Sequence, residues 1–126
     1  MAEAGRAPFG SIPLGSVSAD TVIARDGSRS RTAGELSDRV VRTANWLRET
    51  TPPGGGLAVM ADNRVEILEL LLAAVLAGRW LTPVNPRLTA AEVAFILADS
   101  GAQLILTDDR HRRIVDDAQR IPGAPV

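Results

Sequence analysis

The sequence predicts an α/β fold in three layers, in which a mostly parallel sheet is flanked by helices. Apolar segments of strand length, centred near Val59, Thr82 and Ile105, alternate with longer segments of helical period. The strand segments are apolar throughout, which is typical of parallel strands covered on both faces. Their even spacing indicates repeated strand–helix units joined by right-handed crossovers.

The chain is expected to begin with a lead-in and a hairpin. Residues 1–19 are rich in Gly, Ala, Ser and Pro and have no period, so we expect a loosely ordered segment. Residues 21–25 read as a short strand that Asp26-Gly27 ends in a turn, and residues 29–31 return as the second arm. The α/β subdomain is therefore expected over residues 20–126.

The first helix is expected to open at Thr32, because Glu35 follows at the spacing of a capping box. On its solvent side, Glu35–Arg39 and Asp38–Arg42 have the i,i+4 spacing of helix ion pairs. The residues 52–54, Pro-Pro-Gly, end it. Its apolar stripe consists of Leu36, Val40, Ala44 and Leu47.

The second helix is expected at residues 63–77, with Asn63 as its cap, Glu66 in the capping-box position and Gly78 closing it. This segment is apolar almost all round, so it should be buried on more than one side. A small sheet covers only one side. We therefore expect either a homo-oligomer or a further C-terminal portion to cover the rest.

The third helix is expected between Thr89, with Glu92 in its capping box, and Gly101. Asp108 or Asp109 is expected to open a fourth. The sequence ends in a loop where another parallel strand is due, which favours a piece of a larger protein or an obligate oligomer. The inner stripe of the fourth helix is predicted to be Ile114, Ala118 and Ile121.

The composition excludes several functions. The formal net charge of −1 provides no basic excess, so no nucleic-acid partner is expected. The chain has no Cys, which excludes thiolate metal sites and thiol catalysis, and all 14 of its basic residues are Arg. No lysine is therefore present to bind a phosphate or form a Schiff base. No apolar run is long enough to span a membrane and no signal peptide is visible, so we expect a cytoplasmic protein.

Three segments contain residues that could bind a ligand or take part in catalysis, but for each a structural role is the favoured interpretation. The Gly-rich residues 52–56 run from helix to strand, the reverse of a phosphate loop, which favours a turn. Asp108 and Asp109 follow a strand and have the chemistry for Mg²⁺, although helix capping is the favoured interpretation. His111 lies among charged residues on a predicted solvent face, which favours a surface role.

Asn63-Arg64 and Asn85-Pro86-Arg87 also follow predicted strands. The guanidinium of Arg87 can bind a phosphate or carboxylate in bidentate fashion. A surface ion pair with Glu92 or Asp99 is the favoured alternative. The residues by themselves supply no complete catalytic set.

From Leu57 to Asp108 the sequence resembles the N-terminal region of AMP-binding, adenylate-forming acyl-CoA synthetases, the family of fatty-acid–CoA ligases. The resemblance extends back to about residue 20 through the segments 31–40 and 44–48. The individual segments are generic, but their order and spacing together are specific. Asn85-Pro86-Arg87-Leu88 resembles acyl- or aryl-CoA synthetases more than peptide-synthetase domains. Relatives usually have Asp where this chain has Gly55.

The resemblance implies a ligase that joins a fatty or aryl carboxylic acid to ATP and then transfers the acyl group to CoA. The phosphate loop, the Mg²⁺-binding motif and the catalytic lysine of the family are absent from this chain. No catalytic residue or metal ligand is therefore assigned, the chain alone is expected to bind no cofactor and to be inactive, and ATP, Mg²⁺ and CoA belong to the full-length family. One position carries over: Arg87 is expected to contact the nucleotide phosphate of CoA.

Two alternatives stay open. The chain could be a free-standing, non-catalytic α/β binding or regulatory module, with a homodimer covering the apolar helix. An unrelated small α/β ligand-binding protein rests on fold analogy only.

Overall fold

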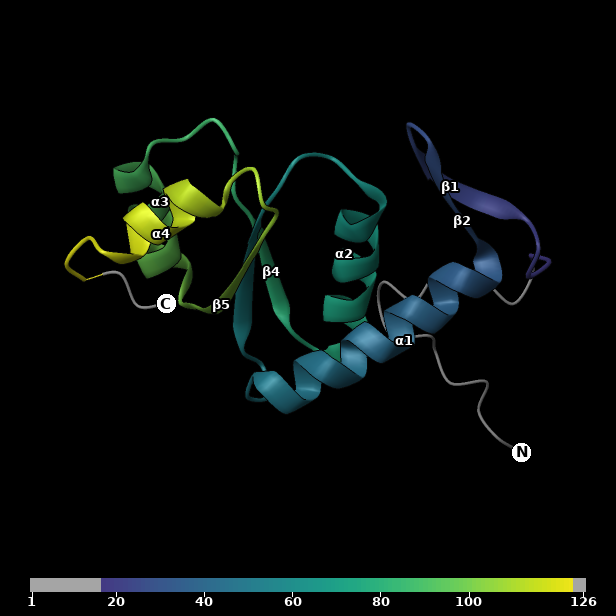
Figure 1. Cartoon of the computed structure of the whole chain (residues 1–126). Coiled ribbons are helices and arrows are strands. Elements are labelled where there is room, and N and C mark those ends of the chain that lie inside the picture. The colour runs from purple at the N-terminus through teal and green to yellow at the C-terminus, as the bar shows by residue number, and fades with distance from the viewer. Residues whose placement is uncertain (1–16, 124–126) are drawn as a thin grey trace. The chain divides into compact units, whose positions relative to one another are not determined.

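The computed structural model describes residues 17–123 (Figure 1). Most of the expected lead-in, residues 1–16, lies outside this range. The described residues form two compact units, one from residues up to Thr50 together with Arg64–Gly78, the other from Thr51–Asn63 together with the residues from Arg79 onward. The elements in chain order are β1 (Val22–Asp26), β2 (Arg29–Thr32), α1 (Ala33–Thr50), β3 (Gly56–Met60), α2 (Val65–Ala77), β4 (Trp80–Pro83), α3 (Ala90–Ser100), β5 (Ala102–Thr107) and α4 (Arg112–Gln119).

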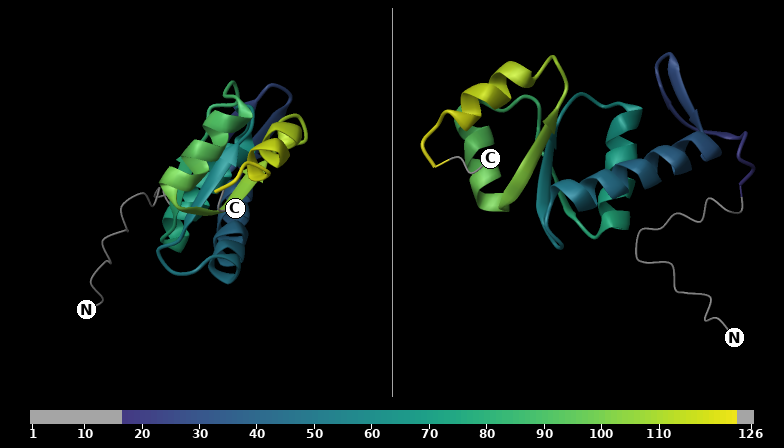
Figure 2. Two further views of the ribbon diagram at one scale, coloured as in Figure 1. Left: turned by 90° about the vertical axis from the view of Figure 1, so that its left-hand side faces the viewer. Right: turned by 60° about the horizontal axis from the view of Figure 1, so that its bottom comes forward.

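The first unit combines an antiparallel hairpin with two packed helices (Figure 2). Strands β1 and β2 pair with Arg25 opposite Ser30, and Gly27 takes the turn at a φ of 53°. The predicted hairpin is therefore confirmed. Helix α1 packs against α2, and the four residues of its predicted apolar stripe are all buried: Leu36, Val40, Ala44 and Leu47.

Helix α1 begins as predicted. The Thr32 hydroxyl accepts a hydrogen bond from the Glu35 amide at 3.2 Å, and the Glu35 carboxylate accepts one from the Thr32 amide at 3.0 Å. The Asp38–Arg42 ion pair is also present, at 2.6 Å. The predicted Glu35–Arg39 pair is wrong, because Glu35 is held by the cap and Arg39 turns to Glu69 on α2.

Helix α2 begins differently from the prediction. Its N-cap residue is Arg64, not Asn63, and the cap side chain makes no hydrogen bond to the helix. The amide of Val65 instead donates to the Asp26 carboxylate at 2.6 Å. Glu66 does not complete a capping box with Asn63 but pairs with Arg29 and Arg64. Chain segments far apart in sequence thus satisfy the first turn of this helix.

The second unit contains a parallel three-stranded sheet in the order β4-β3-β5. The central strand places Ala58 beside Thr82 on one side and beside Ile105 on the other. Helices α3 and α4 lie next to each other over one face of the sheet (Figure 1). The core under them is formed by Ala58, Met60, Val84, Val93, Ala94, Leu97, Ala102, Val115 and Ala118. The predicted α/β class, with a parallel sheet flanked by helices, is confirmed.

The prediction for α3 agrees with the structure, whereas the prediction for α4 agrees only in part. Helix α3 has the expected capping box between Thr89 and Glu92, and it ends at Gly101 with a φ of 66°. Helix α4 begins only at Arg112, one turn later than predicted. Its buried residues are Val115 and Ala118, whereas Ile114 and Ile121 of the predicted stripe are only half buried.

Some apolar side chains of α2 are not buried by the described residues. One stripe of the helix is covered, but Leu71 and Leu76 are 45% and 38% exposed. The expectation that something further covers this helix therefore stays a prediction. Within residues 17–123, no helix has both the length and the apolar composition needed to cross a membrane.

Candidate functional site at the carboxyl edge of the sheet

The polar residues that the sequence singled out follow the three parallel strands of the second unit. Strands β3, β4 and β5 end at Met60, Pro83 and Thr107. Because parallel strands end at the same edge of a sheet, the residues that follow them gather there, and open α/β sheets bind their ligands at this edge. The segments concerned are residues 61–64, 85–88 and 108–111.

A tight turn holds the segment after β4. The side-chain oxygen of Asn85 accepts a hydrogen bond from the Arg87 amide at 2.9 Å, and its carbonyl accepts one from the Leu88 amide at 3.2 Å. Pro86 fixes the backbone between them, because its ring restricts φ. The backbone from which the Arg87 side chain projects is therefore well defined.

The Arg87 side chain is exposed and makes no hydrogen bond or ion pair with any other residue in the range 17–123. The favoured alternative, an ion pair with Glu92 or Asp99, is wrong. Glu92 uses one carboxylate oxygen to accept hydrogen bonds from both the amide and the hydroxyl of Thr89, at 2.8 and 2.9 Å. These bonds hold the pKa of Glu92 below its usual value. The guanidinium of Arg87 is left with all its donors available to a ligand.

The segment after β5 is organised by Asp108. One of its oxygens accepts the His111 amide at 3.0 Å, and the other accepts the Asp62 amide at 3.0 Å. Burial raises the pKa of Asp108, but these amides and the His111 ring more than offset it, so the pKa is lowered overall. The favoured interpretation, that one of these acids caps α4, is wrong, because the N-cap residue of α4 is His111. Asp108 instead holds the turn before the helix, and Asp109 is exposed.

His111 is not on a solvent face, and that prediction is wrong. The residue is 9% exposed, because its ring folds back so that Nδ1 lies 2.6 Å from Asp108 Oδ1. Its Nε2 lies 3.7 Å from Asp62 Oδ1, and Asp62 also pairs with Arg110 at 2.8 Å. One of the neighbouring charges that favoured a surface role, Asp108, is therefore a partner of the ring.

Asp62, Asp108 and His111 each place a ligand atom within 4.8 Å of the others, a spacing at which a metal ion could bind. The arrangement does not fit the Mg²⁺ that was considered for Asp108 and Asp109. Mg²⁺ takes six oxygen ligands, whereas this cluster offers an imidazole, and its carboxylates already bind His111, Arg110 and backbone amides.

Sequence reasoning did not find Asp62, which lies 46 residues before its partner Asp108. A usable signal existed, since both residues directly follow predicted strands, and the carboxyl ends of parallel strands meet at one edge of a sheet. Among the described residues, Arg87 forms no hydrogen bond or ion pair with Asp62, Asp108 or His111, so the edge holds two separate groups.

The Gly-rich segment before β3 is a turn, as favoured. The amide of Gly55 donates to the carbonyl of Pro52 at 2.9 Å, and Gly54 has a φ of 70°. A Cβ atom at Gly55 would lie 2.8 Å from that carbonyl and 2.6 Å from the Gln103 side chain. The glycine is therefore packed where relatives are expected to have Asp.

The comparisons with known proteins identify this architecture. The structure resembles a benzoate-CoA ligase from Burkholderia xenovorans, with a TM-score of 0.77 and 26% identity over 83% of this chain and 22% of that one. It also resembles a fatty acyl-CoA synthetase from Mycobacterium tuberculosis, with a TM-score of 0.72 and 28% identity over 77% of this chain and 20% of that one. The fold is that of the N-terminal domain of adenylate-forming enzymes.

The sequence comparisons agree. A model of the family described as AMP-binding enzyme matches residues 16–125, so the chain belongs to that family. It is 39% identical over 92 residues to a feruloyl-CoA synthase from Amycolatopsis, a match that covers 72% of this chain and 19% of the relative. It is 37% identical over 98 residues to a fatty acid–[acyl-carrier-protein] ligase from Streptomyces coeruleorubidus, over 77% and 18%. The chain thus spans about a fifth of these relatives.

Proposed function

We propose that this chain is the N-terminal scaffold portion of an ATP-dependent acyl-CoA synthetase whose substrate is a fatty or aryl carboxylic acid. The family match over residues 16–125 carries the proposal, because it covers most of the chain. The chain spans only about a fifth of each relative. This supports the word portion in the proposal: other residues supply the rest of the catalytic domain. A cytoplasmic location belongs to the same proposal.

In the proposed reaction, a carboxylate oxygen attacks the α-phosphorus of ATP and pyrophosphate leaves, which gives an acyl-adenylate. The thiol of CoA then attacks the acyl carbon and AMP leaves. Both steps depend on stabilising negative charge around phosphates. The 126 residues contain no lysine. We therefore expect this chain by itself to bind neither ATP nor Mg²⁺ productively and to be inactive.

Arg87 is the residue proposed to act on a ligand. Its guanidinium is exposed at the carboxyl edge of the sheet, has no partner among the described residues and projects from a turn that Asn85 fixes. Five N–H donors in a planar fork suit a phosphate oxyanion. We assign it to the nucleotide phosphate of CoA, so that it binds and orients CoA without taking part in adenylation.

The inactivity of the chain has a direct test. We expect the purified 126-residue chain to show no carboxylate-dependent exchange between ATP and pyrophosphate. Exchange above the level without enzyme, abolished by removing the acid, would contradict this part of the proposal. An antibody to residues 20–123 and intact-mass analysis would then measure the native product. A product well above 13.3 kDa supports the synthetase, whereas a stable 13.3 kDa product favours a free-standing, non-catalytic module.

The assignment of Arg87 is tested in the intact product. We expect Arg87→Ala to raise the KM for CoA by about tenfold, the loss of one charge-assisted contact, and to leave ATP–pyrophosphate exchange unchanged. Arg113→Ala is the matched control, because Arg113 is also an exposed arginine of the second unit. An equal effect of the two substitutions, or loss of exchange in Arg87→Ala, would overturn the assignment.

A further inference from the structure

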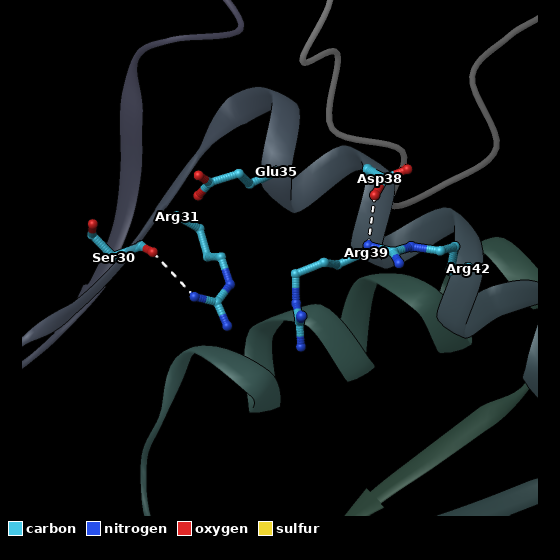
Figure 3. Close-up of a pocket in the computed structure, with 6 residues that line it drawn as sticks. All are labelled: Ser30, Arg31, Glu35, Asp38, Arg39 and Arg42. Atoms are coloured by element: carbon cyan, nitrogen blue, oxygen red, sulfur yellow. Dashed lines mark hydrogen bonds and ion pairs between the residues drawn. The ribbon is translucent and has the colours of Figure 1, made fainter.

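A second polar site lies within the first unit. A pocket of about 350 Å³ opens between the hairpin and α1. Figure 3 shows the side chains around it, with the guanidinium groups of Arg31 and Arg39 lying next to each other above α2. The residues that line it are Ser30, Arg31, Glu35, Asp38, Arg39 and Arg42.

The two arginines share one acceptor atom. Glu69 of α2 is 3% exposed, and its Oε1 accepts from Nε of Arg31 at 2.8 Å and from Nε of Arg39 at 2.7 Å. Two guanidinium groups thus share one carboxylate oxygen, while the pocket as a whole combines three arginines with three acids, Glu69 included. Like charges held this close repel each other, and an anion between them would relieve the repulsion.

Both arginines keep donors for such an anion. Arg31 uses Nη1 for the carbonyl of Ser30, which leaves its Nη2 without an acceptor among the described residues. Arg39 uses only Nε within the same range, so its two Nη groups are available. Guanidinium Nη groups bind oxyanions with short, charge-assisted hydrogen bonds.

The acids that line the pocket are held by other groups. The Glu35 carboxylate accepts the Thr32 amide in the cap of α1. Asp38 pairs with Arg42 at 2.6 Å. Neither acid forms an ion pair with Arg31 or Arg39 in the described residues. Their charges reduce the local field but do not occupy the free Nη donors.

We propose that this pocket binds a phosphate-type oxyanion between Arg31 and Arg39. The pocket is large enough for one phosphate group and its first waters, since a water occupies about 30 Å³. The ligand is either free inorganic phosphate or a phosphate monoester. The site is independent of the proposed synthetase reaction, because it involves neither Arg87 nor the sheet edge.

A titration with the full 126-residue chain tests this site. Arg39 and Arg42 also line a neighbouring depression with Trp46, so the indole reports on their positions. We expect inorganic phosphate to change Trp46 fluorescence saturably in a Trp80→Phe background, and sodium chloride at equal ionic strength to give no saturable change. Tighter binding of glycerol 3-phosphate than of phosphate would identify a monoester as the ligand. No saturable change with either would overturn the proposal.

Two substitutions with opposite expected signs make the test specific. Arg39→Gln should weaken phosphate binding by tenfold or more, whereas Glu69→Gln should tighten it several-fold, because it removes the competing carboxylate and keeps the side-chain shape. Arg25→Gln is the matched control, since Arg25 is an exposed arginine of the same unit and does not line the pocket.

Folding is controlled by measuring thermal unfolding of each variant with and without phosphate. Phosphate should raise the midpoint of Glu69→Gln by more than that of the parent chain. Arg39→Lys, which keeps the charge but loses the planar fork, should bind more weakly than the parent and more tightly than Arg39→Gln. Equal binding by the parent, Arg39→Gln and Arg25→Gln would overturn the assignment.

Discussion

Helices α2 and α3 each need hydrogen-bond acceptors for the free backbone amides of their first turn. In α3 the acceptor is a neighbour in sequence, whereas in α2 it lies far away along the chain. In α3, the Thr89 side chain accepts the Glu92 amide and Glu92 returns a bond to the Thr89 amide. In α2, the cap residue contributes no side-chain bond, and Asp26 accepts the Val65 amide from 39 residues away. The start of α3 is set locally, whereas the start of α2 depends on the folded hairpin.

The difference teaches that a helix start without a local cap depends on tertiary structure. Asp26 also pairs with Arg29, and Glu66 in the first turn of α2 pairs with the same arginine. The hairpin turn and the start of α2 therefore form one charged network. We expect these parts of the first unit to lose their structure together, and α3 to retain its cap when they do.

The largest loss of stability is expected from a substitution in the core under α3. Leu97→Ala should lower the free energy of unfolding by about 3 kcal/mol, because Leu97 is fully buried and the surrounding residues can only partly fill the space. Leu71→Ala in α2 is the control, since Leu71 is 45% exposed, and it should change the free energy by less than about 0.5 kcal/mol. Denaturant unfolding measures both. Equal effects would contradict the assigned burial.

Asp26→Ala comes next and breaks the cap of α2. It leaves the Val65 amide without its acceptor and removes the ion-pair partner of Arg29. We expect a greater loss of stability than from the local cap substitution in α3, and faster amide hydrogen exchange in the first turn of α2. Exchange that speeds up equally in α3 would show that the two starts are not independent.

Thr89→Ala removes the local cap of α3. The expected loss is about 1 kcal/mol, typical of an N-cap hydroxyl. Thr89→Ser serves as its control because it keeps the acceptor oxygen. A serine variant as unstable as the alanine variant would show that the methyl group, and not the hydrogen bond, stabilises this position.

The smallest effect is a difference in acid sensitivity. The Val65 amide holds the pKa of Asp26 below its usual value, with Arg29 contributing, and the Thr89 amide and hydroxyl do the same for Glu92. A carboxyl whose folded pKa is lowered stabilises the fold above its unfolded pKa and loses that contribution as pH falls through the folded value. Stability should therefore fall below about pH 4.

Glu92→Gln separates the two contributions to that fall. The substitution should remove only the share of the acid dependence that belongs to α3, and it should leave the share of Asp26 in place. Thermal midpoints measured from pH 7 to pH 3 test this. An unchanged profile in both Glu92→Gln and Asp26→Asn would contradict the pKa directions assigned to these two carboxyls.

Much of the fold was predictable because it follows from short-range patterns. The apolar runs gave the parallel strands, the hydroxyl–carboxylate spacing gave two of the three predicted capping boxes, and the Asp26-Gly27 turn gave the hairpin. Asn63 and Glu66 have the same spacing without forming a box. Asp26 supplies the acceptor instead, and no short window of sequence contains that information.

The candidate sites were predictable to a smaller degree. Arg87 stood out through its place after a strand. That it has no partner within residues 17–123 depends on Glu92 being held by Thr89. His111 was misplaced because a run of charged residues resembles a solvent face, although Asp108 folds its ring inward. The shared contact of Arg31 and Arg39 with Glu69 joins residues 38 and 30 positions apart and has no local pattern.

The order of strands in the sheet also determines how long the central strand lacks its neighbours while the protein is being synthesised. The central strand β3 leaves the ribosome first, but its two neighbours are β4 and β5, and β5 begins at Ala102, 42 residues after β3 ends at Met60. At about 5–20 residues per second, the central strand waits roughly 2–8 s for its second partner. During that interval the apolar segment of α2 has already emerged, so the nascent chain is most exposed to chaperones and to aggregation before residue 107 is made.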